Sequence, residues 1–493
     1  MMLFLSTVLS LVTSSAVVIA TESDTSLFVS VELNGKTFVN KGIVGYGFIP
    51  SNFVESTGDT LGGIGSGIAI KRGTFAKLGD NFTGTFVVQP DRGFNIDGTI
   101  DYQGRQHEID FVLSPYYGTD NLTFEDAQKT LNLTYKSTLL YWDRGDDVRT
   151  TGLDALGIRP SQDGDPEMPI PSLDFNHLSV DCEGIALSAD SFWMSDEYGP
   201  YIYHFNSSGH LQHTIQPPKA FLPFTDDSLN FTSAEDPDTG RAANQGFEGL
   251  TLSPDGKTLF ALLQSATMQD GGSDKTTNRY TRLLAYDISD AENPELVGEY
   301  IVPLPQSKKK GKTRAQSEMH YAGPSTFLVL ARDGSGKGSD PDDTESSYKQ
   351  ADLIDISLAT DIHGSQFDDP SNPVAPDGVL DSGVIPATYV SFVSYINDTQ
   401  LARFGLHNGG DDPTSETLIA SKWESLALAP CEDDDFPNDF FLFTAADNDF
   451  QSTQGIFNGT SFDAGIDNDN AFLVFRVTLP TLDAASGSEA IGI

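Results

Sequence analysis

The sequence contains little cysteine, few basic residues and, after its first 20 residues, no long apolar run. Only 2 of the 493 residues are cysteine, which excludes a small scaffold held together by many disulfides. The 8 histidines are scattered, and none has the spacing of a zinc site. P-loops, Gly-x-Ser-x-Gly elbows and His-Glu-x-x-His motifs are also absent, which argues against the classes that carry them. Without a later apolar run of about 18 residues, we predict no membrane span.

Basic residues are scarce relative to acidic ones, 29 against 71, and the net charge is −42. Nucleic acid and anionic membranes should repel such a chain, so we expect neither as a partner. We expect a monomer that acts on a small molecule. Two interpretations of the charge stay open. It serves solubility, or some of the carboxylates hold a divalent cation such as Ca²⁺, which prefers oxygen ligands.

The N-terminus and the glycosylation sequons predict a secreted, extracellular glycoprotein. Residues 1–20 are apolar and small and precede the polar TESD, which favours a signal peptide, although the usual Lys or Arg is missing. In an oxidising compartment Cys182 and Cys431 are expected to form a disulfide; two separate buried thiols are the alternative. Seven Asn-x-Ser/Thr sequons follow, at Asn81, Asn121, Asn132, Asn206, Asn230, Asn397 and Asn458.

A hairpin motif recurs along the chain and predicts an all-β fold. It reads DCEGIALSADSFWMSDEYG from 181, GFEGLTLSPDGKTLFALLQ from 246, and KWESLALAP from 422 followed by DFFLFTAADND, with weaker copies from 65 and 317. Each copy is an apolar strand, a turn and a second apolar strand. One such hairpin with further outer strands, about every 65 residues, is typical of a propeller blade. A β-sandwich is the alternative.

We therefore predict a β-propeller of about six four-stranded blades, with five to seven possible. The propeller spans 60–478, with long loop insertions. Residues 21–59 hold N-terminal strands that can take part in ring closure, and 479–493 form a C-terminal tail.

The repeats predict a ring of charged side chains at one mouth of the propeller channel. The first strand of a blade usually lines this channel, and the start of that strand lies beside the end of the second strand. The recurrent glutamates at the starts are Glu183, Glu248, Glu318 and Glu424. The second-strand ends add Asp91, Arg92, Asp196, Glu197, Gln264, Arg332, Asp447 and Asp449. Crowded carboxylates need protons, arginines or a divalent cation. The alternative for each glutamate is a clamp that accepts hydrogen bonds from the neighbouring blade.

The segments DCEGIALS, SDEYGPYIYHF, NQGFEGLTLSPDGKTLFALLQ and WESLALAP resemble the phytase-like family, also described as "esterase-like activity of phytase". The resemblance covers roughly 60–475 and points to a secreted eukaryotic, fungal member. It implies a repeated β fold with recurrent Glu and Asp residues suspected of catalysis. The chain departs from the family pattern at Ser425, where Gly is common, and at Cys182, where Pro is common; the glutamates are retained.

The leading functional hypothesis is a hydrolase of phosphate or carboxylate esters, assisted by a divalent cation, Ca²⁺ in the first instance. A non-catalytic propeller that binds a ligand or partner, and a metal-dependent lactonase by fold analogy, are the alternatives. The candidate catalytic residues are Glu183, Glu248, Glu424, Asp196 and Glu197. The candidate substrate-binding residues are Arg92, Arg332 and Gln264, and the candidate metal ligands are Glu183, Glu248, Glu318, Asp91, Asp447 and Asp449.

Overall fold

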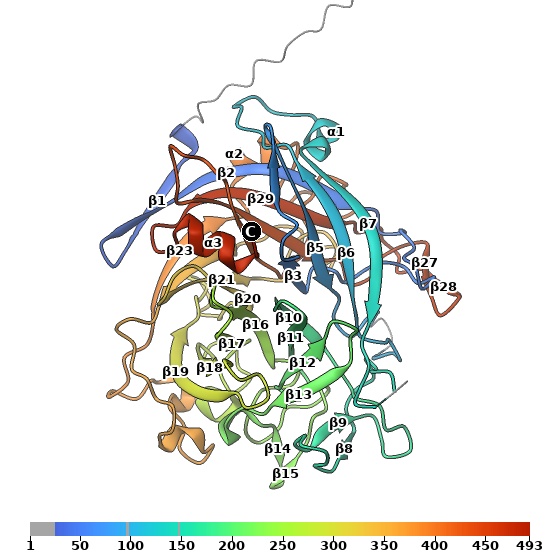
Figure 1. The fold of residues 1–493 in the computed structure, drawn as a ribbon, viewed down its shortest axis with the longest axis vertical. Coiled ribbons are helices and arrows are strands. Elements are labelled where there is room, and N and C mark those ends of the chain that lie inside the picture. Colours follow the sequence, from blue (N-terminus) through green and yellow to red (C-terminus); the bar gives the residue numbers. More distant parts are fainter. Residues whose placement is uncertain (1–24, 95–97, 146–147) are drawn as a thin grey trace, which may run out of the picture.

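Five β-sheets surround a common centre in the computed structural model, which describes residues 25–94, 98–145 and 148–493 (Figure 1). Each sheet is one blade of a β-propeller. The predicted signal peptide, 1–20, lies outside the described residues. Within the described part of the chain, no helix has the length and hydropathy needed to cross a bilayer.

The four blades that are continuous in sequence each begin with the innermost strand and proceed outward. Blade 1 holds β3 (Gly67–Ile70), β4 (Ala76–Leu78), β5 (Asn81–Gln89), β6 (Arg105–Leu113) and β7 (Leu131–Leu140). Blade 2 holds β10 (Cys182–Leu187), β11 (Ser191–Asp196), β12 (Ile202–Asn206) and β13 (Leu211–Ile215). Blade 3 holds β16 (Phe247–Leu252), β17 (Thr258–Leu263), β18 (Tyr280–Asp287) and β19 (Glu295–Pro303). Blade 4 holds β20 (Gln316–Tyr321), β21 (Thr326–Arg332), β22 (Lys349–Asp355) and β23 (Thr388–Ser394).

Blade 5 is built from both ends of the chain. From the centre outward it contains β24 (Lys422–Trp423) and β25 (Ala427–Pro430), then β26 (Asp439–Asp447), β29 (Asn470–Thr478), β2 (Lys36–Ile49) and β1 (Val29–Leu33). Strand β2 runs antiparallel to β29, with Ile49 opposite Asn470 and Val39 opposite Thr478. Figure 1 shows this pairing as the blue β2 beside the red β29. Hydrogen bonds between the two ends of the chain therefore complete the ring.

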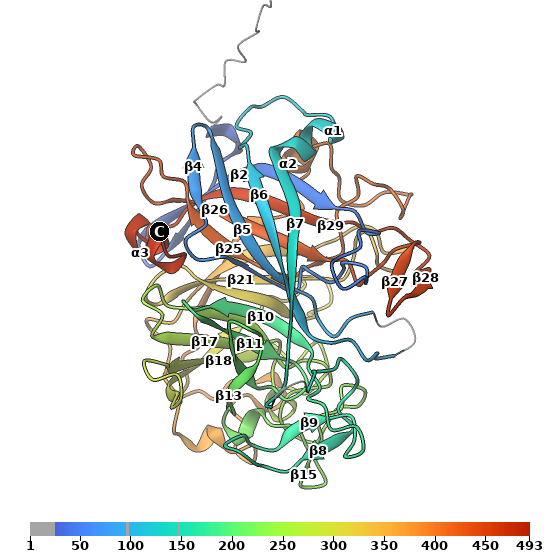
Figure 2. The same ribbon diagram turned by 45° about the vertical axis from the view of Figure 1, so that its right-hand side comes forward.

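The propeller has five blades, which lies within the predicted range of five to seven and is one fewer than the favoured count of about six. The intervals between copies of the hairpin motif before Glu183 and before Glu424 are longer than one blade, and they hold insertions. Small hairpins occupy several insertions along the chain, namely β8 (Gly157–Arg159) with β9 (Met168–Ile170), β14 (Phe224–Thr225) with β15 (Ser228–Leu229), and β27 (Gly455–Phe457) with β28 (Thr460–Phe462) (Figure 2). The α-helices are short: α1 (Phe124–Ala127), α2 (Asp398–Arg403) and α3 (Ala484–Ala490). Polar, Pro-rich insertions lengthened the spacing without adding a blade.

The hydrophobic core lies between neighbouring blades. Phe86 of β5 packs against Phe443 of β26 and Phe472 of β29, with ring centroids 5.1 and 5.7 Å apart. Because each sheet is covered on both faces, strands such as TLFALL in β17 are apolar on both sides. This packing fixes the angle between blades and so the positions of the inner strands.

The predicted disulfide is absent, and both cysteines are free thiols. Cys182 lies in the core between blades 1 and 2, beside residues such as Phe192. Cys431 lies in the core between blades 5 and 1, with residues such as Phe441. Because the two side chains belong to different cores, each serves as a small buried apolar group. The alternative of two separate buried thiols is the arrangement observed.

Candidate functional site at the propeller hub

A β-bulge lies at or beside the recurrent glutamate on the inner strand. In blade 3 Phe247 pairs with Leu263 and Gly249 with Leu262, which leaves Glu248 as the extra residue. In blade 2 the register shifts between Cys182 and Ile185, around Glu183. In blade 5 the inner strand is interrupted between β24 and β25, where Glu424 lies. A bulge re-aims a side chain relative to the regular pleat, so these carboxylates leave the sheet face and enter the hub.

The glycine that follows the glutamate allows neighbouring inner strands to touch. A Cβ atom on Gly184 would lie 2.5 Å from the carbonyl oxygen of Glu248 in the next blade. In blade 1 the equivalent glycine is Gly67, which follows Ser66, and a Cβ atom on it would lie 2.4 Å from the carbonyl oxygen of Glu183. Both approaches are closer than any side chain permits, so glycine is required at these positions. The same approach brings Glu183 and Glu248 together across the boundary between blades 2 and 3.

Three carboxylates form what we call the Glu183 cluster: Asp181, Glu183 and Glu197, each offering an oxygen within 4.8 Å of the others. All three side chains are buried, with Glu183 only 6% exposed. Arg92 reaches the edge of the cluster, where its Nη1 lies 3.0 Å from Asp181 Oδ2. Among the described residues, no hydrogen bond or ion pair reaches the carboxylate of Glu183 or Glu197, and Glu197 Oε1 is fully enclosed without a partner.

Glu248 lies beside this cluster with an unsymmetrical environment. Gln264, at the end of β17, donates a hydrogen bond to its Oε1. Its other oxygen, Oε2, is buried without a partner among the described residues. Burial, followed by the charges of Glu197 and Glu424, raises the pKa of Glu248 well above its ordinary value. Burial and the neighbouring Glu248 likewise raise the pKa of Glu183, and burial raises that of Glu197 to about 8.

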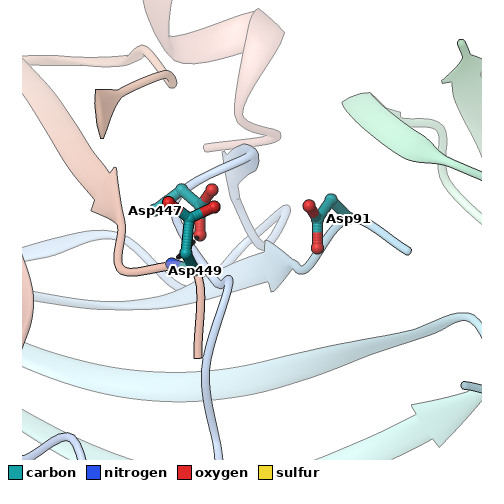
Figure 3. Close-up of side chains that lie close together, drawn as sticks. All are labelled: Asp91, Asp447 and Asp449. Atoms are coloured by element: carbon teal, nitrogen blue, oxygen red, sulfur yellow. Dashed lines mark hydrogen bonds between the residues drawn. The ribbon is translucent and has the colours of Figure 1, made fainter. Parts of the chain in front are cut away.

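A second group, the Asp91 cluster, contains Asp91, Asp447 and Asp449, also with oxygens within 4.8 Å of one another. Figure 3 shows Asp91, from the loop after β5, across from the two aspartates at the end of β26. Lys422 Nζ forms an ion pair with Asp447, lies 2.8 Å from Asp449 Oδ1 and lies 3.6 Å from Glu424 Oε1. Burial alone would lower the pKa of Lys422, but Asp447 and Asp449 raise it well above its ordinary value. This cluster therefore has a cation of its own.

Arg332 and Glu424 join the two clusters. Arg332, the last residue of β21, forms an ion pair with Glu424 Oε1. Its guanidinium group also lies near Glu248, whose charge acts on the pKa of Arg332. The side chains of Arg92 and Arg332 are each 16% exposed, and that of Lys422 is 27% exposed. The cations are thus more exposed than most of the carboxylates they contact.

Two of the predicted site residues, Glu318 and Asp196, accept hydrogen bonds from backbone N–H groups and so have structural roles. Oε1 of Glu318 accepts hydrogen bonds from the backbone N–H groups of Met319, at 2.7 Å, and of Leu250 in the adjacent blade, at 3.0 Å. This is the clamp that sequence reasoning left as the alternative; in blade 4 the extra residue of the bulge is Ser317, not Glu318. Asp196 accepts backbone hydrogen bonds from Asp181, at 2.7 Å, and Gly199, at 2.8 Å. It fixes the backbone that carries Asp181.

Sequence reasoning missed Asp181 and Lys422, which complete the two clusters. Both stand two residues before the recurrent glutamate of their repeat, Glu183 and Glu424 respectively. Residues two apart on a strand face the same side, so this spacing was a usable signal. It was obscured because blades 3 and 4 carry Gly246 and Gln316 at that position.

A cavity of about 340 Å³ lies at the other end of the channel, away from the charged ring. Apolar residues of the inner strands downstream of the glutamates line it, together with α3; they include Ile68, Ile185, Leu250, Leu428 and Ile491. The inner strands thus separate a charged mouth from an apolar one.

Comparison with known proteins assigns the chain to a family. The model of the family described as phytase-like, "esterase-like activity of phytase", matches residues 60–450. A protein of Arthroderma benhamiae described as an uncharacterized secreted protein is 40% identical over 460 residues, 85% of this chain and 88% of that one. In agreement with this relative, the chain is a secreted protein.

Solved structures match at low similarity. A putative oxidoreductase (glucose dehydrogenase) of Thermus thermophilus is 10% identical, with a TM-score of 0.27, over 84% of this chain and 98% of that one. A virginiamycin B lyase of Staphylococcus aureus is 10% identical, with a TM-score of 0.26, over 92% of this chain and 99% of that one. These scores carry no functional argument. On the family match and the secreted relative, the chain belongs to the phytase-like family.

Proposed function

We propose that the chain hydrolyses phosphate or carboxylate esters at the charged mouth of the channel, with a divalent cation held by hub carboxylates. The observation that carries this proposal is the combination found at the hub. Buried carboxylates with unpartnered oxygens, Glu197 and Glu248, lie beside two half-buried arginines, Arg92 and Arg332. Titratable groups perturbed by burial and by specific charges are frequent at catalytic sites.

The arginines are suited to hold the substrate. A guanidinium group can grip two oxygens of a phosphate or carboxylate at once. Arg92 and Arg332 each keep a carboxylate partner, Asp181 and Glu424, which fixes the orientation of the guanidinium. The basic loop 307–315 connects β19 to β20 at this same mouth, because β20 begins there. It offsets locally the net charge of −42 that would otherwise repel an anionic ester.

Glu248 is suited to remove a proton from the attacking water. Its Oε1 is fixed by Gln264, and its Oε2 is free to accept a proton. A raised pKa is what a general base or acid needs near neutral pH. A bound divalent cation would polarise the ester oxygen and lower the pKa of a bound water. The all-oxygen donor set of the hub fits a hard cation such as Ca²⁺.

The test is hydrolysis by purified, folded protein. Release of phosphate from phytate and of nitrophenol from p-nitrophenyl phosphate and acetate is measured with Ca²⁺ and with a chelator. We expect Ca²⁺-dependent turnover that Glu248→Gln lowers by at least about 100-fold, in line with the loss of a general base. Glu292→Gln, an exposed residue, is the matched control. The proposal would be refuted if the folded wild-type protein hydrolysed none of the three substrates.

A second function, binding without catalysis, is favoured by one observation. The hub glutamates are nearly enclosed, with Glu248 4% and Glu424 5% exposed, so direct access for a bulky ester is narrow. In that case Glu248→Gln would change ligand or ion affinity in a protein that has no turnover to lose.

A further inference from the structure

The two acidic clusters at the hub have a similar spacing of carboxylate oxygens, but they differ in how their negative charge is compensated. In both, three carboxylate oxygens lie within 4.8 Å of one another. Groups of this kind are common at protein surfaces, so their spacing alone does not distinguish them. What differs is the positive charge already present and the number of oxygens that have no partner.

The Asp91 cluster already contains a cation that the chain itself supplies. The ammonium group of Lys422 contacts Asp447 and Asp449 and lies 3.6 Å from Glu424. Asp447 also accepts the backbone N–H of Asp449, at 2.7 Å. Lys422 therefore stands where a bound cation would have to stand.

Among the described residues, no cation forms ion pairs across the Glu183 cluster as Lys422 does in the Asp91 cluster. The buried Arg241 acts on Glu197 through its charge, but its guanidinium donates to the backbone oxygens of Tyr198 and Phe231. Arg92 reaches only its edge, at Asp181, and its Nη1 also donates to Ser233 Oγ at 2.9 Å. The carboxylates of Glu183 and Glu197 have no hydrogen-bond or ion-pair partner among the described residues. Buried carboxylates without partners are costly unless a cation or protons compensate them.

A further carboxylate approaches the Glu183 cluster from the next blade. Strands β10 and β16 touch at Gly184 and Glu248, where an added Cβ would come within 2.5 Å. Glu248 is 4% exposed, and its Oε2 is enclosed without a partner. No hydrogen bond or ion pair within the described part of the chain compensates this oxygen, and the charge of Glu248 acts on Glu183.

We propose that the hub binds one Ca²⁺ ion, held by Asp181, Glu183 and Glu197, with Glu248 beside the ion and not bound to it, and that Lys422 takes the place of a second ion at the Asp91 cluster. All three donors are carboxylates, which suits a hard cation better than zinc or copper. The assignment specifies the cation of the proposed function, but ion binding does not require that the chain be an enzyme.

The experiment measures Ca²⁺ binding in the absence of substrate. Chelator-treated protein is titrated with Ca²⁺ alone by isothermal calorimetry, and folding of every variant is checked by circular dichroism. The wild type should bind one ion per chain. Glu197→Gln should weaken binding by at least about tenfold, because the site loses a charged ligand. Asp449→Asn, the matched change in the Asp91 cluster, should alter affinity less than about twofold, since only screened charge is removed.

Lys422→Gln gives the sharper result. Removing the ammonium group should leave the Asp91 cluster without its cation, so that the number of Ca²⁺ ions bound per chain rises from one to two. If Glu197→Gln fails to fold, Glu183→Gln replaces it. The proposal is overturned if the wild type binds no ion or two ions, or if Asp449→Asn abolishes binding while the Glu183-cluster variants retain it. Because no ester is present, these outcomes are independent of whether the protein hydrolyses phytate or aryl esters.

Discussion

At the scale of single residues, glutamates that look alike in the sequence have different tasks. In Glu248, Oε1 accepts a hydrogen bond from Gln264 and Oε2 has no partner among the described residues. In Glu318, by contrast, Oε1 accepts hydrogen bonds from two backbone N–H groups. Burial raises the pKa of Glu318 well above its ordinary value, with both N–H groups acting in the opposite direction. Glu318 thus has a structural role at the contact between blades 3 and 4, and its replacements should affect stability and not ion binding.

The Glu318 prediction compares two substitutions. Glu318→Ala leaves the buried N–H of Leu250 without an acceptor and should cost about 1–3 kcal/mol of unfolding free energy. Glu318→Gln keeps a carbonyl acceptor on a side chain of the same shape, so its loss should be under about 1 kcal/mol. Urea unfolding measures both values. A Glu318→Gln protein that loses Ca²⁺ affinity as Glu197→Gln does would instead identify Glu318 as a ligand.

His107 makes stability depend on pH. It is buried on β6, with Nδ1 2.8 Å from Thr138 Oγ1. Burial, and then the charge of Arg105, lower its pKa from 6.5 to about 3. Between those two values the unfolded chain binds a proton that the folded chain does not. The contribution of His107 to stability is therefore complete above about pH 6.5 and declines as pH falls toward 3.

The measurement compares the wild type with His107→Gln by urea unfolding at several pH values from 7 to 4. Other groups titrate in both proteins, so the difference between the curves reports His107. Below pH 6.5 the wild type should lose stability relative to the variant by up to about 1.4 kcal/mol per pH unit. Parallel curves would contradict the prediction.

At the scale of elements, the repeat made the hairpins and most hub residues predictable. The apolar strands and turns around Glu183 and Glu248 identify blades 2 and 3 from composition and spacing alone. The bulge register was not predictable, because a shift by one residue at Ser317 leaves no trace in the local pattern of apolar residues. The ion pairs of Lys422 also escaped prediction, because they depend on the strand register that places Lys422 of β24 opposite Asp447 of β26.

Element lengths explain why the favoured count of about six blades exceeds the five observed. The insertion before β10 and those before β23 and β24 are polar segments whose length approaches that of a blade. Spacing between repeats measures a blade only when the connections are short. The hub itself is insensitive to these insertions because the inner hairpins of the blades keep short turns, as at 188–190 and 253–257.

At the scale of the whole molecule, the ring depends on strands from both ends of the chain. Strand β2 lies between β29 and β1 and buries Phe38 and Ile43 in the core shared with blade 4. Strand β1 is at the outer edge, and of its residues only Leu33 is fully buried. The two N-terminal strands should therefore differ greatly in what they contribute to folding.

Two truncations test this difference, each secreted behind the same signal peptide. Removing β1, with the mature chain starting at Asn34, leaves β2 paired with β29 and should lower the melting temperature by only a few degrees, since about one apolar side chain is exposed. Removing β1 and β2 together leaves β29 as an open edge and exposes an apolar core face, which should abolish cooperative melting and favour aggregation. Melting is followed by circular dichroism, and aggregation by light scattering. Two truncated proteins that melt alike would show that the ring holds without β2, and the hub geometry would then be maintained by the four continuous blades together with β24, β25, β26 and β29.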